Sequence, residues 1–321
     1  MTAFDRRSVA AGLGLSLLGV RAARSADYRN FDPNQPIVAE VRPNAPPENQ
    51  ILETARDPYR RMTAPVLLNR QGPYFFVVDT GANQSVICSE IASSLALPTG
   101  PTLALHGVAG VEDTPTVVVP EVKIGSNLEK DVRMPMLPRQ AIGADGILGV
   151  DRLRDQRLTL DFKRRHLEIQ KSHYEDVPPF TSSVKARQRS GQLTIVDADL
   201  GGIKVAAFLD SGAERTIGNS ALLNLAVLRN PTSKFYETPV ISVTGKTVVG
   251  QIAVLPVLRL GNVRLVDIAV TFADLHIFQI WGLQTPAVLV GMDALSVFNS
   301  VTLDFGRAEV WFELYPGRKR L

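Results

Sequence analysis

The sequence contains very little cysteine and histidine. Its 321 residues include one cysteine, Cys88, and four histidines. A single cysteine excludes an intramolecular disulfide, and no two histidines have the spacing of a metal-binding motif, so each is expected to be a surface or packing residue. A cysteine protease would pair Cys88 with a histidine, but none lies near it in the sequence, so a packing role is favoured. The sequence therefore predicts neither a metal site nor a cofactor.

Long hydrophobic runs and an excess of one charge are also missing. The apolar stretch Ala10–Val20 is too short to cross a bilayer, which takes roughly 20 residues. The first 25 residues hold four arginines and one aspartate, so the remainder holds 31 basic and 31 acidic side chains. No basic stripe, Walker loop, dinucleotide fingerprint or serine-hydrolase elbow is present. These absences disfavour nucleic acids and nucleotides as partners.

The N-terminus is typical of an export signal. Arg6 and Arg7 precede the apolar run, and small residues follow it up to Ala26. We expect residues 1–26 to be a twin-arginine-type signal peptide of an exported bacterial protein, cleaved near Ser25 or Ala26. The mature chain is then expected to be periplasmic, without stable membrane insertion. The alternatives are an uncleaved anchor and a cytoplasmic N-terminus with chance arginines.

A short phrase occurs twice in the chain. Residues 75–82 read Phe-Phe-Val-Val-Asp-Thr-Gly-Ala, and residues 206–213 read Ala-Ala-Phe-Leu-Asp-Ser-Gly-Ala. Each phrase is followed by a hydrophobic-hydrophobic-Gly element and then by a Thr-Leu-Asp-Phe element. The three pairs of elements lie 131, 142 and 143 residues apart. Periods this long indicate duplicated domains rather than a solenoid of short repeats.

The composition between these elements predicts strands far more than helices. β-branched and aromatic residues alternate with turn residues through both halves, and the expected strands include Leu158–Ile169 in the first half and Val263–Phe272 in the second. A helix is expected after each Asp phrase, over Ser89–Leu97 and Asn219–Leu225, with short helices starting at Asp151 and Asp293. The apolar run Leu275–Leu283 is expected to be core or cleft wall. The predicted organisation is a signal peptide (1–26), an extended Pro-rich arm (27–63), an N-terminal lobe (64–171), a connector (172–192), a C-terminal lobe (193–316) and a basic tail (317–321).

The duplicated phrases resemble those of the retropepsin-like aspartic proteases. The resemblance covers about residues 64–315 and includes the second elements Ile147-Leu148-Gly149 and Leu289-Val290-Gly291. It implies an all-β fold with few short helices, in which two β-barrel lobes are related by a pseudo-two-fold axis and the active site lies between them. Because both phrases lie in one chain, the expected active unit is a monomer.

The residues of each phrase suit the hydrolysis of peptide bonds. Two carboxyl groups that meet, here those of Asp79 and Asp210, share one proton because both cannot ionise side by side. Such a pair activates a water molecule and polarises the scissile carbonyl group. The hydroxyl groups of Thr80 and Ser211 are expected to hold the lobes together. Gly81 and Gly212 allow close approach of the backbones, and Ala82 and Ala213 are expected to form the floor.

A protease of this kind also needs a lid that excludes water. The resemblance places one flap at His106-Gly107-Val108-Ala109-Gly110 and the other at Ser242-Val243-Thr244-Gly245. The alternative is two ordinary surface hairpins. We also expect substrate contacts from Ile147, Leu148, Leu289 and Val290. The sequence departs from its relatives at Val150 and Met292, where retroviral enzymes have an arginine, and in the flaps, which lack the tyrosine of pepsin-like enzymes.

Two classes of function follow from these patterns. The first is an aspartic endopeptidase that acts on exported or periplasmic proteins. The second is a catalytically idle protein of the same fold that binds peptides or serves as a scaffold in the periplasm. Both Asp residues and both hydroxyl groups are intact, which favours the enzyme. A chain that needs a second copy for activity is a further alternative that the internal repeat makes unnecessary.

Overall fold

The computed structural model describes residues 40–41, 61–107, 110–125, 127–164, 166–189, 192–195, 197–241 and 247–315. The chain divides into two compact units, residues 1–36 and residues 37–321, and all described residues belong to the second unit. The predicted signal peptide and basic tail therefore lie outside the described residues, as does most of the predicted arm. Among the helices within these ranges, none combines the length and hydrophobicity needed to cross a membrane.

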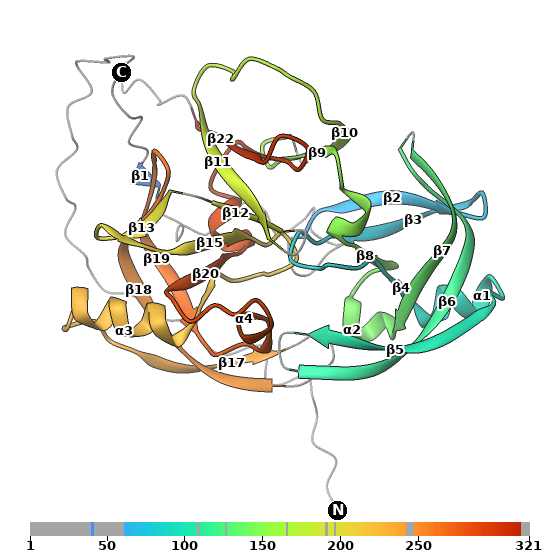
Figure 1. Cartoon of the computed structure of the whole chain (residues 1–321), viewed down its shortest axis with the longest axis horizontal. Helices are drawn as coiled ribbons and strands as arrows, with labels where there is room; N and C mark the ends of the chain where they lie inside the picture. Colours follow the sequence, from blue (N-terminus) through green and yellow to red (C-terminus); the bar gives the residue numbers. More distant parts are fainter. Residues whose placement is uncertain are drawn as a thin grey trace, which may run out of the picture. The chain divides into compact units, whose positions relative to one another are not determined.

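The first half of the chain forms a seven-stranded sheet, which Figure 1 shows in blue and green. Its strand order is β2-β3-β8-β4-β7-β6-β5, and β2 also pairs with β6. This extra pairing makes the sheet barrel-like. The elements are β2 (Thr63–Leu68), β3 (Gln71–Val78), β4 (Val86–Cys88), α1 (Ser89–Ser94), β5 (Thr99–Gly107), β6 (Gly110–Ile124), β7 (Asn127–Leu137), α2 (Arg139–Ile142), β8 (Gly146–Leu148) and the 3-10 helix η1 (Val150–Arg152).

The second half repeats this arrangement within a fifteen-stranded sheet. One addition to the repeat is β1 (Glu40–Val41), which pairs in parallel with β19. The hairpin of β13 and β14 matches the turn end of the β2–β3 hairpin, since β13 pairs with β18 as β2 pairs with β6. The elements of this half are β12 (Gln192–Ile195), β13 (Ala198–Leu200), β14 (Ile203–Lys204), β15 (Ala206–Leu209), β16 (Ile217–Gly218), α3 (Ser220–Arg229), β17 (Tyr236–Ile241), β18 (Thr247–Leu260), β19 (Val263–Phe272), α4 (His276–Ile280), β20 (Ala287–Val290) and α5 (Met292–Leu295).

The strands that end in the two Asp phrases have the same neighbours in both halves. β3 lies parallel to β8, and β15 lies parallel to β20. β4 and β16 then pair antiparallel to β8 and β20, and parallel to β7 and β19. The apolar residues of β3 and β15 just before each Asp are buried, which fits strands that are covered on both faces. The duplicated sequence therefore folds into a duplicated strand topology.

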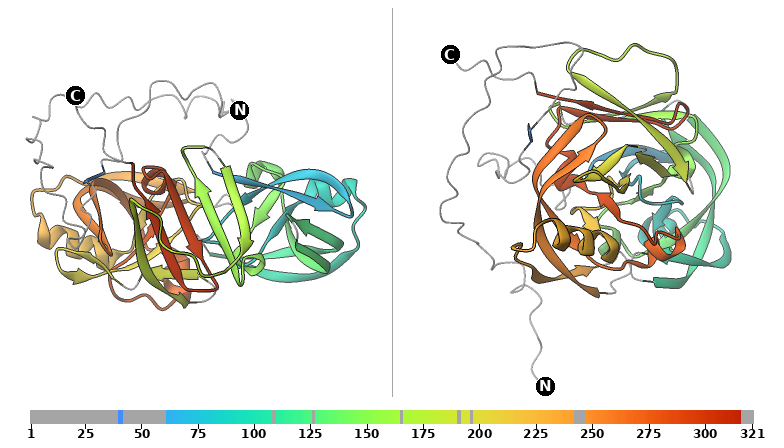
Figure 2. Two further views of the ribbon diagram at one scale, coloured as in Figure 1. Left: turned by 90° about the horizontal axis from the view of Figure 1, so that it is seen from above. Right: turned by 60° about the vertical axis from the view of Figure 1, so that its left-hand side comes forward.

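A set of strands from both halves joins the two repeats. β9 (Gln156–Asp161) pairs with β10 (His166–Lys171) and also with β21 (Ser300–Asp304). β21 pairs with β22 (Glu309–Glu313), which pairs with β11 (Thr181–Arg189). In the left view of Figure 2, these green and red strands run side by side. The first and second halves are thus bound by continuous backbone hydrogen bonding.

Several elements differ from the sequence prediction in a way that has a local cause. The run Leu158–Ile169, predicted as one strand, forms the hairpin of β9 and β10. Its turn is stabilised by the amide of Arg164, which donates to Asp161 Oδ1 at 2.7 Å. The repeat is matched at Arg307, whose amide donates to Asp304 Oδ1 at 2.9 Å. An Asp side chain that accepts an amide three residues ahead favours a turn over a continuous strand.

Other elements were also not predicted, among them β5, β11 and α4. β11 occupies nine residues of the segment interpreted as a connector. Its alternation of buried Val184 and Ala186 with exposed charged residues is the signal that identifies it as a strand. The apolar run Leu275–Leu283 forms α4, with Phe278 and Trp281 buried. Cys88 is also buried, in agreement with its predicted packing role.

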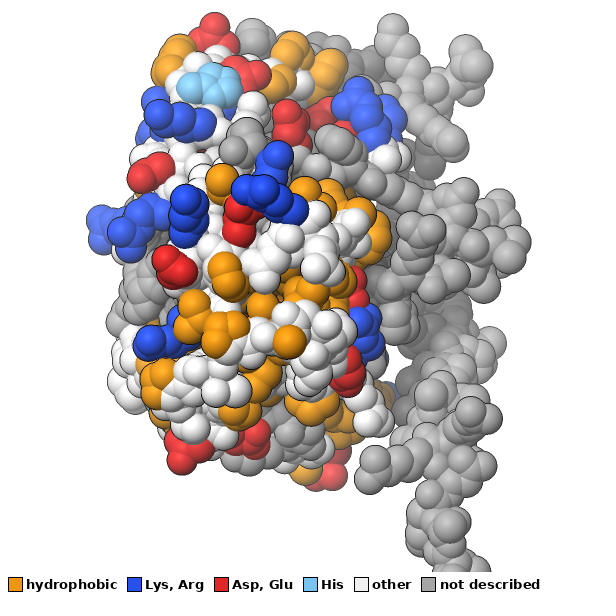
Figure 3. Space-filling view, turned by 90° about the vertical axis from the view of Figure 1, so that its right-hand side faces the viewer, with side chains coloured by type: hydrophobic (Ala, Val, Ile, Leu, Met, Phe, Trp, Pro, Cys, Tyr) orange, Lys and Arg blue, Asp and Glu red, His pale blue; other side chains and the backbone are white. Residues whose placement is uncertain are grey.

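The outer face of the first half carries a mixed surface. Figure 3 shows hydrophobic side chains interspersed with blue and red charged side chains. On the described part of this face the basic side chains do not form a continuous stripe.

Candidate active site

The two Asp residues lie at the ends of equivalent strands and are fixed by equivalent backbone bonds. The Asp79 amide donates to the carbonyl oxygen of Leu148 at 3.0 Å, and the Asp210 amide donates to that of Val290 at 3.0 Å. Each Asp phrase thus turns away from its strand at the point where the hydrophobic-hydrophobic-Gly element passes beside it. The two elements of the sequence repeat are therefore neighbours in space.

The hydroxyl groups of Thr80 and Ser211 bind across the two halves. Thr80 Oγ1 donates to the Leu209 carbonyl oxygen at 2.7 Å and accepts the Ser211 amide at 3.0 Å. Ser211 Oγ donates to the Val78 carbonyl oxygen at 2.8 Å and accepts the Thr80 amide at 3.1 Å. Both residues are fully buried, so these reciprocal bonds are shielded from water. They hold the two Asp loops in a fixed relative position, as the sequence predicted for these hydroxyl groups.

Backbone amides surround each carboxyl group. Asp79 Oδ1 accepts the amides of Gly81 at 2.8 Å and Ala82 at 3.0 Å. Asp210 Oδ1 accepts the amides of Gly212 at 3.0 Å and Ala213 at 3.1 Å. Because both amides bind Oδ1 of each Asp, the Oδ2 atoms stay available for the contact between the halves.

Each glycine of the phrases lies directly against the Asp of the opposite half. A Cβ atom on Gly81 would collide with the carboxyl group of Asp210, and one on Gly212 would collide with that of Asp79. Because these contacts involve the carboxyl groups themselves, any side chain would displace them. The glycines therefore permit the approach of the two Asp loops, as predicted.

The carboxyl groups of Asp79 and Asp210 hydrogen-bond each other. Burial, followed by the negative charge of Asp79, raises the pKa of Asp210 to about 8. Burial also raises the pKa of Asp79, against the opposing effects of the Gly81 amide and of the hydrogen bond with Asp210. Asp79 keeps more of its surface exposed than Asp210, which is 8% exposed. Both pKa values are raised, so the coupled pair is expected to retain one shared proton near neutral pH.

Arg61 adds a positive charge to one side of this pair. Its Nη2 atom donates to the Ile142 carbonyl oxygen at 2.7 Å, and its charge lowers the pKa of Asp79. The neighbouring Met62 carbonyl oxygen accepts the amide of Val78, one residue before Asp79. Arg61 falls in the predicted arm and was not predicted as a site residue, because no local pattern connects it to an Asp located 18 residues later.

A second polar contact supports each Asp loop from behind. Ser85 Oγ donates to Asp151 Oδ1 at 2.7 Å and accepts the amide of Gly149 at 3.0 Å. In the second half, Thr216 Oγ1 donates to Asp293 Oδ1 at 2.7 Å and accepts the amide of Gly291 at 3.1 Å. These supporting residues were not predicted from the sequence.

A repeated signal could have identified this support. A hydroxyl residue stands six positions after each Asp of the phrases, and an Asp stands two positions after each Gly of the second elements. Both features recur in both halves, as expected for groups that fix a shared local geometry.

The predicted flaps are described only in part. In the first half, β5 and β6 form a hairpin in which His106 is paired with Val111 and Gly107 with Gly110, while Val108 and Ala109 lie outside the described residues. In the second half, β17 and β18 form a hairpin up to the pair of Ile241 with Thr247. The predicted residues Ser242, Val243, Thr244 and Gly245 lie outside the described residues. Substrate contact by either hairpin stays a prediction.

The other predicted contact residues lie close to the Asp pair but differ in exposure. Ala82 and Ala213 are half-buried, next to the carboxyl groups. The second-element side chains are at most 4% exposed and belong to the hydrophobic core; these are Ile147, Leu148, Leu289 and Val290. Their backbone groups position the Asp residues, whereas a contact between their side chains and substrate stays a prediction.

The described residues offer no alternative chemistry at Cys88 or at a metal. Burial raises the pKa of the Cys88 thiol, which disfavours the reactive thiolate. Within the described ranges, no three His, Cys, Asp or Glu side chains are grouped so that they could hold a metal ion. The chemical capacity of the site therefore rests on the paired carboxyl groups.

Comparisons with known proteins agree with this arrangement. A family model described as aspartyl protease matches residues 64–152 and again residues 196–294. Each match spans one Asp phrase and the hydrophobic-hydrophobic-Gly element that follows it. No curated protein matches the chain.

Solved structures with similarity to the chain include EIAV protease complexed with the inhibitor HBY-793, at 30% identity over 29% of this chain and 86% of that one, with a TM-score of 0.23. A retropepsin-like aspartic protease from Rickettsia conorii is 20% identical over 30% of this chain and 82% of that one, with a TM-score of 0.23. Basic 7S globulin from soybean is 11% identical over 78% of this chain and 90% of that one, with a TM-score of 0.39.

Proposed function

Because this chain belongs to the aspartyl protease family, we propose that it is an aspartic endopeptidase that uses Asp79 and Asp210 to activate water. The observation that carries this proposal is the direct hydrogen bond between the two carboxyl groups, one from each half. A pair that shares one proton supplies a base and an acid at the same place.

The asymmetry of the pair supports a division of roles. Asp79, which is near Arg61 and more exposed, acts as the ionised base and takes a proton from a water molecule. Asp210, whose pKa is raised to about 8, donates a hydrogen bond to the carbonyl oxygen of the scissile peptide. The water oxygen then adds to the carbonyl carbon. The tetrahedral intermediate collapses when Asp79 gives the proton that it took from the water to the leaving nitrogen, so that the C–N bond breaks and an amine and a carboxyl product leave without a covalent enzyme intermediate.

The alternative is a catalytically idle peptide-binding or scaffold protein. An idle protein would have no need for a carboxyl group in each half, for amide donors to both, or for a shared proton. The intact arrangement of Asp79, Thr80, Asp210 and Ser211 therefore favours the enzyme.

The cellular setting forms the second part of the proposal. The predicted signal peptide supports an exported, periplasmic enzyme with protein substrates, and this signal lies outside the described residues. N-terminal sequencing of the periplasmic protein tests it. We expect a start near Ala26 or Asp27, and an intact Met1 on periplasmic material would contradict cleavage. Export that survives replacement of Arg6 and Arg7 by lysine would contradict the twin-arginine route.

Cleavage profiling of a proteome-derived peptide library tests the activity. We expect the mature protein to cleave a defined set of peptide bonds and Asp79→Asn to cleave none, because the variant lacks the base. A statine-type peptide such as pepstatin should inhibit, since its hydroxyl group replaces the attacking water. Chelators should have no effect. Inactivation by a chelator or by alkylation of Cys88 would contradict the mechanism.

The active unit is proposed to be a monomer, because both Asp phrases belong to one chain. Its specific activity should stay constant on dilution, whereas an enzyme assembled from two chains would lose activity. A steep loss on dilution, accompanied by a change in sedimentation, would contradict the pairing of the two halves within one polypeptide.

A further inference from the structure

Two histidines join the first half to the second at a place distant in sequence from both Asp phrases. His106 lies near the end of β5, and His276 is the first residue of α4. The Nδ1 atom of His106 lies 3.4 Å from the Nε2 atom of His276. From the sequence, His276 was expected to be a surface or packing residue, and only the fold brings it to His106.

The rings meet edge to edge. Their planes differ by 7°, and their centroids are 5.6 Å apart. The centroid separation exceeds the separation of the nitrogens by about the width of one ring, so each nitrogen points at the other. This is the geometry of an N–H···N hydrogen bond rather than of a face-to-face stack.

Such a contact depends on the charge of the two rings. A neutral imidazole has one donor and one acceptor nitrogen, whereas a protonated imidazole has two donors. One hydrogen bond can form when at least one ring is neutral. When both rings are protonated, both facing nitrogens are donors and two positive charges oppose each other. Histidine is the side chain whose charge ordinarily changes between pH 5 and 8.

We propose that the His106–His276 hydrogen bond is a pH-dependent contact that holds the hairpin of β5 and β6 against α4, and that protonation of both rings releases it. The contact holds the hairpin at neutral pH and frees it under acidic conditions. The consequence for substrate entry rests on the proposed function, whereas the contact itself does not.

The two ends of the contact differ in their attachment. α4 is anchored because Phe278 and Trp281 are each 3% exposed, and the Trp281 ring lies 4.6 Å from that of Phe208, two residues before Asp210. His276 thus projects from a helix packed against the strand that carries one catalytic Asp. His106, by contrast, is attached to the core through the pairing of β5 with β6. Release would therefore move the hairpin rather than the helix.

Charged groups also lie on the elements that carry the pair and on their neighbours. Glu112 and Asp113 of β6 are paired with Leu105 and Ala104 of β5. Arg133 of β7 lies beside Gly100 of β5. Ahead of α4, Asp274 accepts the Ser220 amide and hydroxyl group. Substitution of either histidine keeps all four of these charged groups in place, so that only the ring pair changes.

The test follows the histidines directly by NMR in an Asp79→Asn background, which removes any self-cleavage. Ring resonances are recorded from pH 4.5 to 8 with a chelator present. The chain has only four histidines, which keeps the spectra simple. We expect the resonances of His106 and His276 to respond to each other's titration, so that each shows two steps. In His106→Gln, His276 should titrate in one step, and His276→Gln should have the reciprocal effect on His106.

The matched control is His173→Gln, since this exposed histidine contacts the Lys171 carbonyl oxygen instead. It should leave the two-step behaviour unchanged. Hydrogen exchange provides a second readout. After correction for intrinsic rates, the amides of β5 and β6 should exchange at least fivefold faster at pH 5 than at pH 7.5, and this difference should vanish in either Gln variant.

Independent single-step titrations in the parent protein would overturn the proposal, as would an exchange difference that persists in both Gln variants. If the two histidines titrate together while the protein with Asp79 intact shows no peptidase activity, the contact is supported and the proposed function is refuted. The two failures are therefore distinguishable.

Discussion

The two halves share one strand plan around the Asp residues but differ in the charges placed beside it. Both halves present an Asp, a hydroxyl group and a glycine with matching bonds. The charge of Arg61 lowers the pKa of Asp79, whereas the charge of Asp79 raises the pKa of Asp210. The comparison shows that the duplicated parts bring the two carboxyl groups together, while their unequal surroundings support the proposed division of roles between them.

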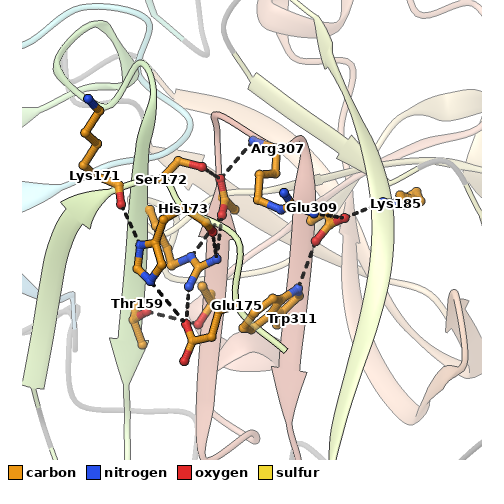
Figure 4. A network of polar contacts seen from close by, with 12 residues as sticks. Thr159, Lys171, Ser172, His173, Glu175, Lys185, Arg307, Glu309 and Trp311 are labelled. Carbon is orange, nitrogen blue, oxygen red and sulfur yellow. Dashed lines mark hydrogen bonds and ion pairs between the residues drawn. The ribbon is translucent and has the colours of Figure 1, made fainter. Parts of the chain in front are cut away.

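A second difference lies in the strands that join the halves. Asp304 is 1% exposed and binds Arg157, which is itself buried, lies over the Trp311 ring and also binds Glu175. Ser172 Oγ donates to Asp304 Oδ1 at 2.6 Å, and Figure 4 shows this network. The equivalent Asp161 binds Arg164, whose side chain is 80% exposed. The same turn residue thus carries a buried ion pair in one half and a surface pair in the other.

The largest expected effect tests the equivalence of the two carboxyl groups. Asp79→Asn and Asp210→Asn should each lower kcat/KM by roughly 10²–10⁴-fold or more, because general acid-base catalysis is lost in either case. Peptide hydrolysis and far-ultraviolet circular dichroism measure activity and folding together. Near-normal turnover in either folded variant would show that the halves are not equivalent in catalysis.

Loss of the arginine partner should destabilise the joining strands more at Asp304 than at Asp161. Arg157→Met leaves Asp304 as a buried charge without its ion-pair partner, and we expect a loss of about 3–5 kcal/mol in the free energy of unfolding. Arg164→Ala removes the exposed partner of Asp161 and should cost under about 1 kcal/mol. Urea unfolding measures both. Equal losses would remove the distinction between the buried and the exposed pair.

The raised pKa of Asp210 predicts a pH dependence of stability. Its folded-state pKa of about 8 exceeds the ordinary value of 3.8, so the native state binds more protons between these values. Stability from this group is complete below about pH 4 and is lost as the pH rises to about 8. Asp210→Asn should therefore be more stable than the parent at pH 8.5, because the amide has no charge to bury.

Thermal unfolding from pH 4 to pH 9 measures this difference, which should shrink toward pH 4 as the parent carboxyl group becomes neutral in the unfolded state as well. Cys88→Ser serves as a control outside the Asp pair. A constant difference between Asp210→Asn and the parent across the range would assign the stabilisation to packing rather than to charge.

A smaller effect than that of Arg157→Met is expected at the reciprocal hydroxyl groups. Thr80→Val leaves the buried Ser211 amide and Leu209 carbonyl group without their partner and should cost about 2 kcal/mol of stability. Ser211→Ala should cost a similar amount through the Thr80 amide and the Val78 carbonyl group. Thr80→Ser is the matched control, because it keeps the hydroxyl group. A small loss of stability in Thr80→Val together with a large loss in Ser211→Ala would show that the two hydroxyl groups do not contribute equally.

Much of the fold and of the Asp pair could be predicted because the signals are local and occur twice. The strand Val263–Phe272 was predicted with the bounds that the structure shows. The roles of Thr80, Gly81, Ser211 and Gly212 in holding the loops follow from their places beside Asp79 and Asp210. The strand β11 was missed because its few apolar residues are small and its charges suggested a connector.

The sequence by itself determined the duplication, the Asp phrases and the all-β character of the chain. Each of these features depends on contiguous residues or on the interval at which the same elements recur. Only the tertiary structure decided that Arg61 would influence Asp79, that Arg157 would bind Asp304 and that His106 would meet His276. Each of these pairings depends on how strands from distant segments align. That alignment is set by the packing and backbone bonding of whole sheets, so no local pattern of residues encodes it.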